Sequence, residues 1–176
     1  VYCYLSRDRP NAAHCAVSAL QERGLLRGGI ITQNVDGLHS AAGSRHLIEI
    51  HGDLHRLRCT QCDWRARVDD YRRLPALPPC QNCGALLRPE VVLFEEMLPP
   101  AATQEFATQL HRGFDLIFSI GTSSQFPYIV QPVLVAKQQG QPTVEINPHE
   151  TVISSLVDVR IPCSAGATLE AIDSAL

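Results

Sequence analysis

Short apolar runs that end in polar turns recur along the chain and predict a set of strands. Residues 29–32 form the first run and residues 47–50 the second. Three more runs follow in the second half of the chain, at 115–120, 142–146 and 158–161. Runs of this length, bounded by Gly, Pro or Asn, are typical of short buried strands.

Three other segments show helical spacing. Pro10 and Asn11 suit a helix start. Apolar side chains then recur at roughly helical intervals, at Ala13, Val17, Leu20 and Leu25, before a Gly-Gly pair ends the pattern. Helices are also predicted at 130–139, where Pro132 should lie in the first turn because it has no N–H to donate, and at 168–176. Strands alternating with helices predict an α/β fold with a parallel sheet covered on both faces.

Composition narrows the class of protein. Hydrophobic residues make up 45% of the 176 residues and charged residues 19%, which excludes a disordered chain. The net charge of −3 gives no basic footprint for nucleic acid. No apolar run approaches a membrane span, and no leader precedes the first helix, so we expect no membrane partner and a cytoplasmic location. The first residue is Val rather than Met, which predicts a fragment or a processed chain.

Residues 59–88 differ in composition from the rest of the chain and read as an inserted small module. They contain two Cys-x-x-Cys pairs, Cys59 with Cys62 and Cys80 with Cys83, separated by 17 residues. This spacing is typical of a four-thiolate zinc site, and a closed cage of that kind is structural rather than catalytic. Two redox-active pairs or two disulfides are the alternatives. The remaining cysteines, Cys3, Cys15 and Cys163, need no metal role.

Polar side chains gather where the predicted strands end, and open α/β sheets bind ligands at such ends. Residues 32–39 place amide, carboxylate and imidazole groups after the first strand, although a turn capped by its own Asn and Asp would look the same. His51 follows the second strand and is either a structural histidine or a general base. The turn at 121–124 can offer N–H groups to a phosphate or can be a plain loop. Asn147, at the end of the next strand, either binds a ligand or belongs to an ordinary turn before a proline.

Together these motifs resemble the sirtuin family of NAD-dependent protein deacylases. The order is that of the family: residues 32–39, Glu49-Ile50-His51-Gly52, the four cysteines, Phe94-Glu95-Glu96, Gly121-Thr122-Ser123 and Asn147. Pro10-Asn11-Ala12-Ala13-His14 is similar to the family's Pro-Asn-x-x-His helix start. The resemblance implies a Rossmann-like NAD-binding domain at 1–58 and 89–176, joined to a zinc-binding module at 59–88. Zn²⁺ would be structural and NAD a co-substrate.

The resemblance also implies roles for individual residues. His51 would be the general base that takes a proton from a ribose hydroxyl after the acyl oxygen has displaced nicotinamide. The catalytic set would be His51, Asn34 and Asp36. The NAD contacts would be Gln33, Asn34, Asp36, Gly121, Thr122, Ser123, Asn147 and Ala165. The activity implied is removal of acyl groups from lysine, with release of nicotinamide and transfer of the acyl group to ADP-ribose.

The segment 91–96 resembles the family's Val-Val-x-Phe-Gly-Glu loop and implies that acylated-lysine proteins or peptides are the substrates. Val92, Phe94 and Glu96 would bind them, by strand addition to the peptide backbone. Glu95 stands where the family usually has Gly, so we expect backbone strain or a reshaped peptide groove at this position.

The front of the chain departs from the family. Residues 1–9 lack its first strand and its Gly-Ala-Gly-x-Ser loop, so we expect an N-terminally truncated sirtuin with an incomplete sheet. This chain alone would then have little activity. Two alternative functions remain open: a non-catalytic zinc-stabilised module that binds acyl-lysine or nucleotide, and a protein mono-ADP-ribosyltransferase.

Overall fold

The computed structural model describes residues 9–26 and 28–176. Cys3 and nearly all of the predicted arm at 1–9 lie outside the described residues. The first described helix, α2, spans Ala12–Glu22. Asn11 caps it, since its side-chain oxygen accepts from the backbone N–H of His14 at 3.2 Å. The sequence prediction of a helix start at Asn11 is therefore confirmed.

The parallel strands form two separate sheets within the described residues. The smaller sheet pairs β1 (Ile30–Thr32) with β2 (Leu47–Glu49), and the larger one has the order β6 (Ile117–Ile120), β7 (Thr143–Ile146), β8 (Val159–Ile161). All five predicted strands are present and every pairing among them is parallel. Their shared direction brings the carboxyl ends of β1, β6 and β7 to one edge of the molecule.

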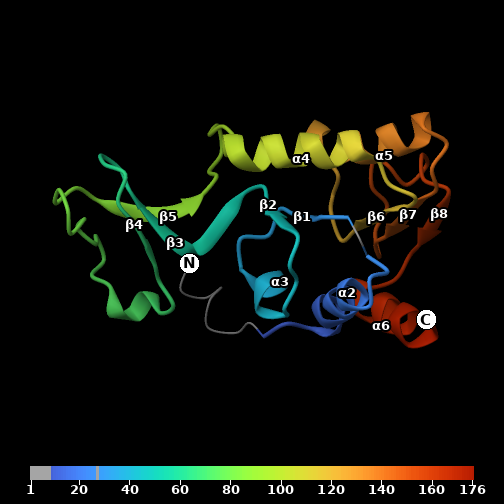
Figure 1. Ribbon diagram of the computed structural model, residues 1–176, viewed down its shortest axis with the longest axis horizontal. Coiled ribbons are helices and arrows are strands. Elements are labelled where there is room, and N and C mark those ends of the chain that lie inside the picture. The colour runs from blue at the N-terminus through green and yellow to red at the C-terminus, as the bar shows by residue number, and fades with distance from the viewer. Residues whose placement is uncertain (1–8, 27) are drawn as a thin grey trace.

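Helices cover both faces of the parallel strands, as predicted (Figure 1). On one face lie α4 (Pro100–Arg112) and α5 (Pro127–Gln138). On the other face lie α2, the short α3 (Leu38–Ala41) and α6 (Ala165–Ala175). Ala16 of α2 packs with Leu169 of α6 and the fully buried Ile146 of β7. None of the helices within residues 9–26 and 28–176 is both long and apolar enough to cross a membrane.

The structure corrects the helix boundaries. The helix predicted at 130–139 begins earlier, at Pro127, so Pro132 is its sixth residue and lies in the second turn rather than the first. Pro127 at the helix start supplies the preorganised φ that the prediction assigned to the later proline. The final helix begins at Ala165 rather than at residue 168. The sequence analysis did not predict α3 or α4.

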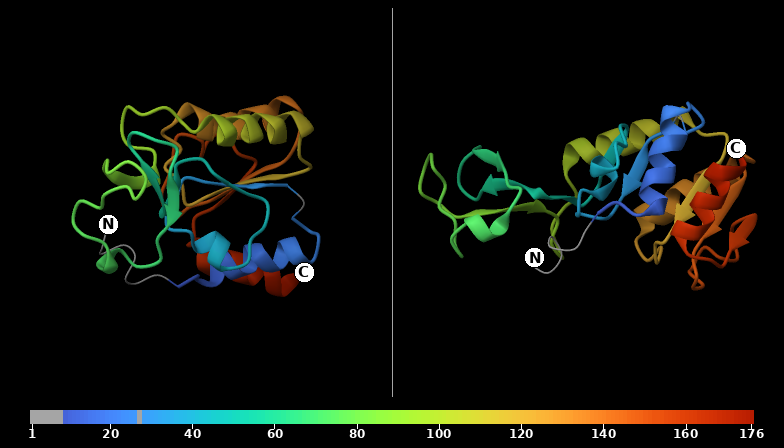
Figure 2. Two further views of the ribbon diagram at one scale, coloured as in Figure 1. Left: turned by 60° about the vertical axis from the view of Figure 1, so that its left-hand side comes forward. Right: turned by 90° about the horizontal axis from the view of Figure 1, so that it is seen from below.

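The parallel sheets and their helices form one body of the molecule, and an antiparallel sheet forms a second body. The second body extends to one side and makes the molecule elongated (Figure 2). Its order is β4 (Arg65–Arg67), β3 (Gly52–Cys59), β5 (Leu87–Val91), and a 3₁₀ turn, η1 (Tyr71–Arg73), packs beside it. The buried core of this body is small and consists of Leu57, Cys59, Val68, Cys80 and Leu87. Two of these five core side chains are predicted zinc ligands, so this core depends on what the thiols bind.

Gly52 joins the two bodies directly after His51. Its φ is +84°, and a Cβ at this position would lie 2.0 Å from the carbonyl oxygen of Glu90. No L side chain fits there, because both the backbone conformation and the contact exclude it. The glycine that follows His51 in the sequence is therefore required by the close approach of β3 to β5.

Candidate active site

Three strand ends are connected by side-chain hydrogen bonds. Gln33, directly after β1, donates from Nε2 to Oγ1 of Thr122, after β6, at 2.9 Å. Asn147, directly after β7, donates from Nδ2 to the carbonyl oxygen of Thr122, also at 2.9 Å. Thr122 is thus the point at which the two parallel sheets contact each other through side chains. Hydrogen bonds therefore connect Gln33, Thr122 and Asn147, which were predicted from three separate motifs.

A cavity of about 550 Å³ lies at this edge. Four of the predicted NAD contacts line it: Gly121, Thr122, Ser123 and Asn147. Five residues that sequence reasoning missed complete the lining: Gln125, His149, Glu150, Thr151 and Val152. Gln125 lies in the turn between β6 and α5, and the other four lie in the loop after β7. The polar composition of these loops gives no signal that distinguishes them from ordinary surface loops.

Glu145 holds that loop in place from below. Its carboxylate is 1% exposed and accepts hydrogen bonds from Oγ1 of Thr151 and Oγ of Ser154, both at 2.5 Å. Arg160 on the neighbouring strand β8 approaches the same carboxylate at 3.6 Å. A buried carboxylate is stable only when it is paired and hydrogen-bonded in this way. The cavity wall at Thr151 is therefore fixed to the sheet.

The turn between β6 and α5 is strained. Ser124 has a φ of +54°, although it is not glycine, and its residue is 1% exposed. Its Oγ is buried with no hydrogen-bond partner among the described residues, while its N–H donates to Oγ1 of Thr122 at 3.2 Å. Strained residues and unpaired buried hydroxyls concentrate at ligand sites.

His51 lies between the two bodies, and both sides of its imidazole are engaged. Its Nε2 lies 2.6 Å from the hydroxyl oxygen of Tyr128, in the first turn of α5. Burial lowers the pKa of His51 below 6.5, and the hydrogen bond to the backbone of Gln33 opposes that shift. We assign the tautomer that carries its hydrogen on Nδ1, which leaves Nε2 to accept from Tyr128. His51 is therefore neutral at pH 7, with Nε2 as the accepting nitrogen.

Asn34 and Asp36 lie in the turn after Gln33. The carbonyl oxygen of Asp36 lies 3.2 Å from Nε2 of His55 on β3. The N–H of Asn34 donates to Oγ1 of Thr32 at 3.1 Å. A carboxylate oxygen of Asp36 accepts from the N–H of Leu38 at 3.0 Å. The Asn34 residue is exposed. Neither residue lines the 550 Å³ cavity, so the structure connects them to it only through Gln33.

The predicted substrate segment adjoins His51. The N–H of Val92 donates to the carbonyl oxygen of His51 at 2.9 Å. Beyond it the loop projects outward, and Phe94 is 95% exposed. Glu96 turns back: its carboxylate accepts two bonds from Arg88, at 2.5 and 3.1 Å, and one from the N–H of Leu93 at 3.0 Å. These bonds lower the pKa of Glu96 to about 2.

Glu95 has a φ of +70°. The expected backbone strain at this position is confirmed, since L residues other than Gly rarely adopt the left-handed region. The backbone conformation at this position favours glycine, yet the chain has Glu there.

The four predicted ligand cysteines form a cluster. Their sulfurs all lie within 4.8 Å of one another, with Cys59 3.5 Å from Cys83 and Cys62 3.7 Å from Cys80. Four thiolates about 2.3 Å from one zinc ion would be roughly 3.8 Å apart, so the cluster fits the metal. The N–H of Gln61 donates to Sγ of Cys59 at 3.3 Å, and backbone bonds of this kind lower the pKa of Cys59 to about 6.

Two features lie away from this edge. Ala165 is the first residue of α6 and does not line the 550 Å³ cavity.

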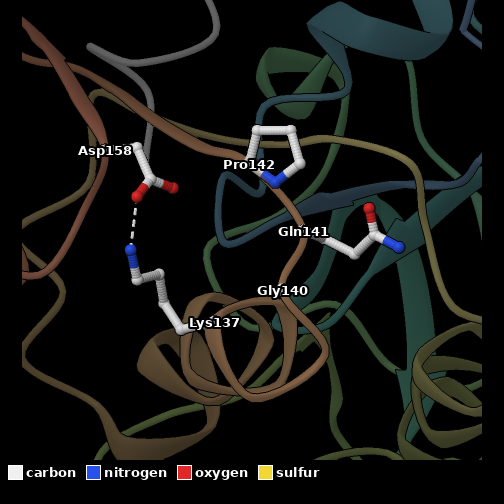
Figure 3. A pocket seen from close by; sticks show the side chains of 5 residues that line it. All are labelled: Lys137, Gly140, Gln141, Pro142 and Asp158. Atoms are coloured by element: carbon white, nitrogen blue, oxygen red, sulfur yellow. Dashed lines mark hydrogen bonds and ion pairs between the residues drawn. The ribbon is translucent and has the colours of Figure 1, made fainter.

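A second hollow of about 350 Å³ lies beside Gly140 and Pro142, near the amino end of β7 (Figure 3). Lys137 and Asp158 form an ion pair across it. No predicted site residue lines this hollow.

Comparisons with known proteins agree with the geometry. The Sir2 family matches residues 2–127. The chain belongs to the Sir2 family. It is 46% identical over 156 residues to "NAD-dependent protein deacylase 2" of Pseudomonas aeruginosa, covering 87% of this chain and 60% of that protein. It is 42% identical over 166 residues to "NAD-dependent protein deacylase 1" of Archaeoglobus fulgidus, covering 92% and 65%.

Solved Sir2 structures share the fold of this chain. A Sir2 homologue in complex with NAD superimposes with a TM-score of 0.91 at 39% identity, covering 99% of this chain and 67% of that one. A Sir2 complex with a p53 peptide and NAD⁺ gives a TM-score of 0.86 at 29% identity, covering 97% and 72%. The Rossmann-like fold expected from the sequence is confirmed. This Sir2-family chain spans less than two thirds of the curated relatives from Pseudomonas and Archaeoglobus.

Proposed function

We propose that this chain carries the catalytic edge of an NAD-dependent protein-lysine deacylase. The observation that carries the proposal is the connection between base and cavity at the end of β1. Gln33 bonds Thr122 beside the 550 Å³ cavity, and Thr32, just before it, accepts from the N–H of Ile50, just before His51. A base and a polar cavity at one sheet edge suit a reaction on a nucleotide's sugar. The relatives' names and the Sir2 complexes with NAD and ADP-ribose support the same conclusion.

His51 would act as the general base. A neutral imidazole with a pKa below 6.5 can accept a proton at neutral pH. A sugar hydroxyl is a weak nucleophile and needs a base within hydrogen-bond reach. When bound, NAD would supply the ADP-ribose group as acceptor and nicotinamide as leaving group.

The chain's own residues would hold the co-substrate along the strand ends. We assign this role to Gln33, Asn34, Asp36, Gly121, Thr122, Ser123, Asn147 and Ala165. Support is strongest for the four residues that line the cavity, Gly121, Thr122, Ser123 and Asn147, and for Gln33, which bonds Thr122. Asn34 and Asp36 would meet the nicotinamide end, next to His51.

Acylated-lysine peptides would bind at the loop after β5. Val92 and Phe94 would contact the substrate, since Val92 is bonded to His51 and Phe94 is 95% exposed. Glu96 would act by holding the loop, because Arg88 and the N–H of Leu93 already occupy its carboxylate. Solved Sir2 structures with a p53 peptide and with a propionylated peptide support this class of substrate.

The cysteine cluster would hold one structural Zn²⁺ in a module separate from the nucleotide domain. The sequence divides the two at residues 59 and 88, whereas strands β3 and β5 extend the antiparallel body out to Gly52 and Val91. The cage of four thiolates has no open position, so the ion would take no part in the chemistry. Reduced thiolate sites persist in reducing compartments, and we propose a cytoplasmic location on that basis.

The test is a turnover assay with NAD and an acetyl-lysine peptide. Even at the low rate expected of the chain alone, nicotinamide and deacetylated peptide should form in equal amounts, and His51→Ala should abolish both. The matched control is His111→Ala, which changes an exposed histidine on α4 and should leave turnover unchanged. ADP-ribose binding without nicotinamide release would contradict the proposal and favour a binding module. ADP-ribose attached to protein would favour transferase activity instead.

A further inference from the structure

Tyr128 lies against the nitrogen that the proposed chemistry needs. Its hydroxyl is 2.6 Å from Nε2 of His51. With the ring hydrogen assigned to Nδ1, Nε2 carries the ring's only available lone pair, and the Tyr128 hydroxyl donates to it. A second hydroxyl cannot bond to Nε2 while Tyr128 does. A substrate hydroxyl must therefore either displace Tyr128 or reach His51 through it.

The surroundings of Tyr128 favour the second arrangement. Its ring packs against the cluster of Ile48, Ile50 and Phe106 that supports β2. The ring also stacks on Phe126, with centroids 5.4 Å apart and planes inclined by 17°. These contacts on both sides, in the first turn of a 12-residue helix, favour a ring that stays beside His51. Burial raises the pKa of Tyr128, so it keeps its proton at neutral pH.

We propose that Tyr128 is a further catalytic residue, which relays a proton from the substrate's sugar hydroxyl to His51. The inference rests on the proposed function. The substrate hydroxyl donates to Oη of Tyr128. As its O–H bond breaks, Oη receives that proton and passes its own to Nε2 of His51. The tyrosine ends the step unchanged, the imidazole ends it protonated, and the sugar oxygen becomes the nucleophile.

The test compares Tyr128→Phe with the unchanged chain. Phenylalanine keeps the ring and its packing and removes only Oη, so the variant should fold normally. We expect kcat for deacylation to fall about 10-fold or more, with little change in KM for NAD. The matched control is Tyr71→Phe, which removes a hydroxyl that donates at 2.5 Å to the carbonyl of Leu54, outside the site. It should leave kcat unchanged.

A crystal structure with ADP-ribose gives a readout independent of turnover. The relay requires Oη of Tyr128 to lie within hydrogen-bond distance of both Nε2 and a ribose hydroxyl. A ribose hydroxyl bonded directly to Nε2, with Tyr128 moved aside, would overturn it, as would a Tyr128→Phe variant as fast as the unchanged chain. An unchanged chain that neither binds ADP-ribose nor releases nicotinamide would instead contradict the proposed function.

Discussion

At the residue scale, the site consists of side chains whose hydrogen bonds leave few degrees of freedom. His51 is held by Gln33 on one side and Tyr128 on the other. Thr122 accepts from Gln33 and Asn147 at once, through its hydroxyl and its carbonyl. Such preorganisation reduces the entropy that a reacting group loses when substrate binds.

The protonation of His51 predicts the acidic limit of activity. Burial holds its pKa below 6.5, and a base works only when it is neutral. Activity should therefore be flat between pH 8 and about 6.5 and should fall only as the pH drops through the lowered pKa. The profile of log kcat/KM against pH, with an NMR titration of the His51 ring, measures this. A midpoint above 6.5 would contradict the assignment.

Glu95 predicts a stabilising substitution. Its φ of +70° costs an L residue about 1–2 kcal/mol, whereas glycine adopts it freely. Glycine gains more entropy on unfolding, which offsets part of that difference, so Glu95→Gly should raise the free energy of unfolding by about 0.5–1 kcal/mol. Urea denaturation measures the change. Glu95→Ala keeps the Cβ and should give no such gain.

At the scale of elements, strand ends and helix starts supply the functional groups. The loop after β7 forms one wall of the cavity because Glu145 within the strand bonds Thr151 and Ser154. The first turn of α5 brings Tyr128 to His51. Regular elements thus fix positions that the loops alone could not hold.

The N-cap of α2 predicts a measurable loss of stability. The side chain of Asn11 accepts from the N–H of His14, and Nδ1 of His14 lies 3.3 Å from the N–H of Asn11. Asn11→Ala removes the cap and should lower the free energy of unfolding by about 1 kcal/mol. Thermal and urea unfolding provide the measurement. Asn11→Asp retains a capping oxygen, and a loss as large as that of Ala would contradict the capping role.

At the scale of the whole molecule, the two bodies have different sources of stability. The parallel sheets and their helices bury Ile146, Val133 and Leu169 in apolar contacts. The antiparallel body has a five-residue core that includes Cys59 and Cys80. Such a small core gives this body little stability of its own, so we expect a bound zinc ion to supply much of it.

Removal of the metal should therefore unfold the antiparallel body and leave the parallel sheets and their helices folded. A zinc chelator applied to the reduced protein should remove hydrogen-exchange protection from β3, β4 and β5 while β6–β8 and α6 retain theirs. Mass spectrometry of exchanged peptides measures both regions in one experiment. Folded, reduced protein that contains no zinc by metal analysis would refute the prediction.

The sequence by itself determined the local features of this protein. The short apolar runs at 29–32, 47–50 and 142–146 predicted their strands, because buried strands need little beyond apolar side chains and turn residues at their ends. Asn11 predicted a helix start because a cap depends on neighbours in the chain. The two Cys-x-x-Cys pairs predicted the cysteine cluster because one metal ion needs four ligands and their spacing is typical of such a site. The order of the motifs identified the family.

Only the tertiary structure decided what meets across the fold. The sequence placed Pro132 in the first turn of its helix, whereas Pro127 takes that position. It also missed α4, because the exposed polar side chains of this helix obscure the helical period. It gave no sign of the contact between Tyr128 and His51, which lie 77 positions apart, or of the cavity wall at Thr151. These features depend on distances between elements, and such distances follow from how the sheets and helices pack rather than from any local pattern.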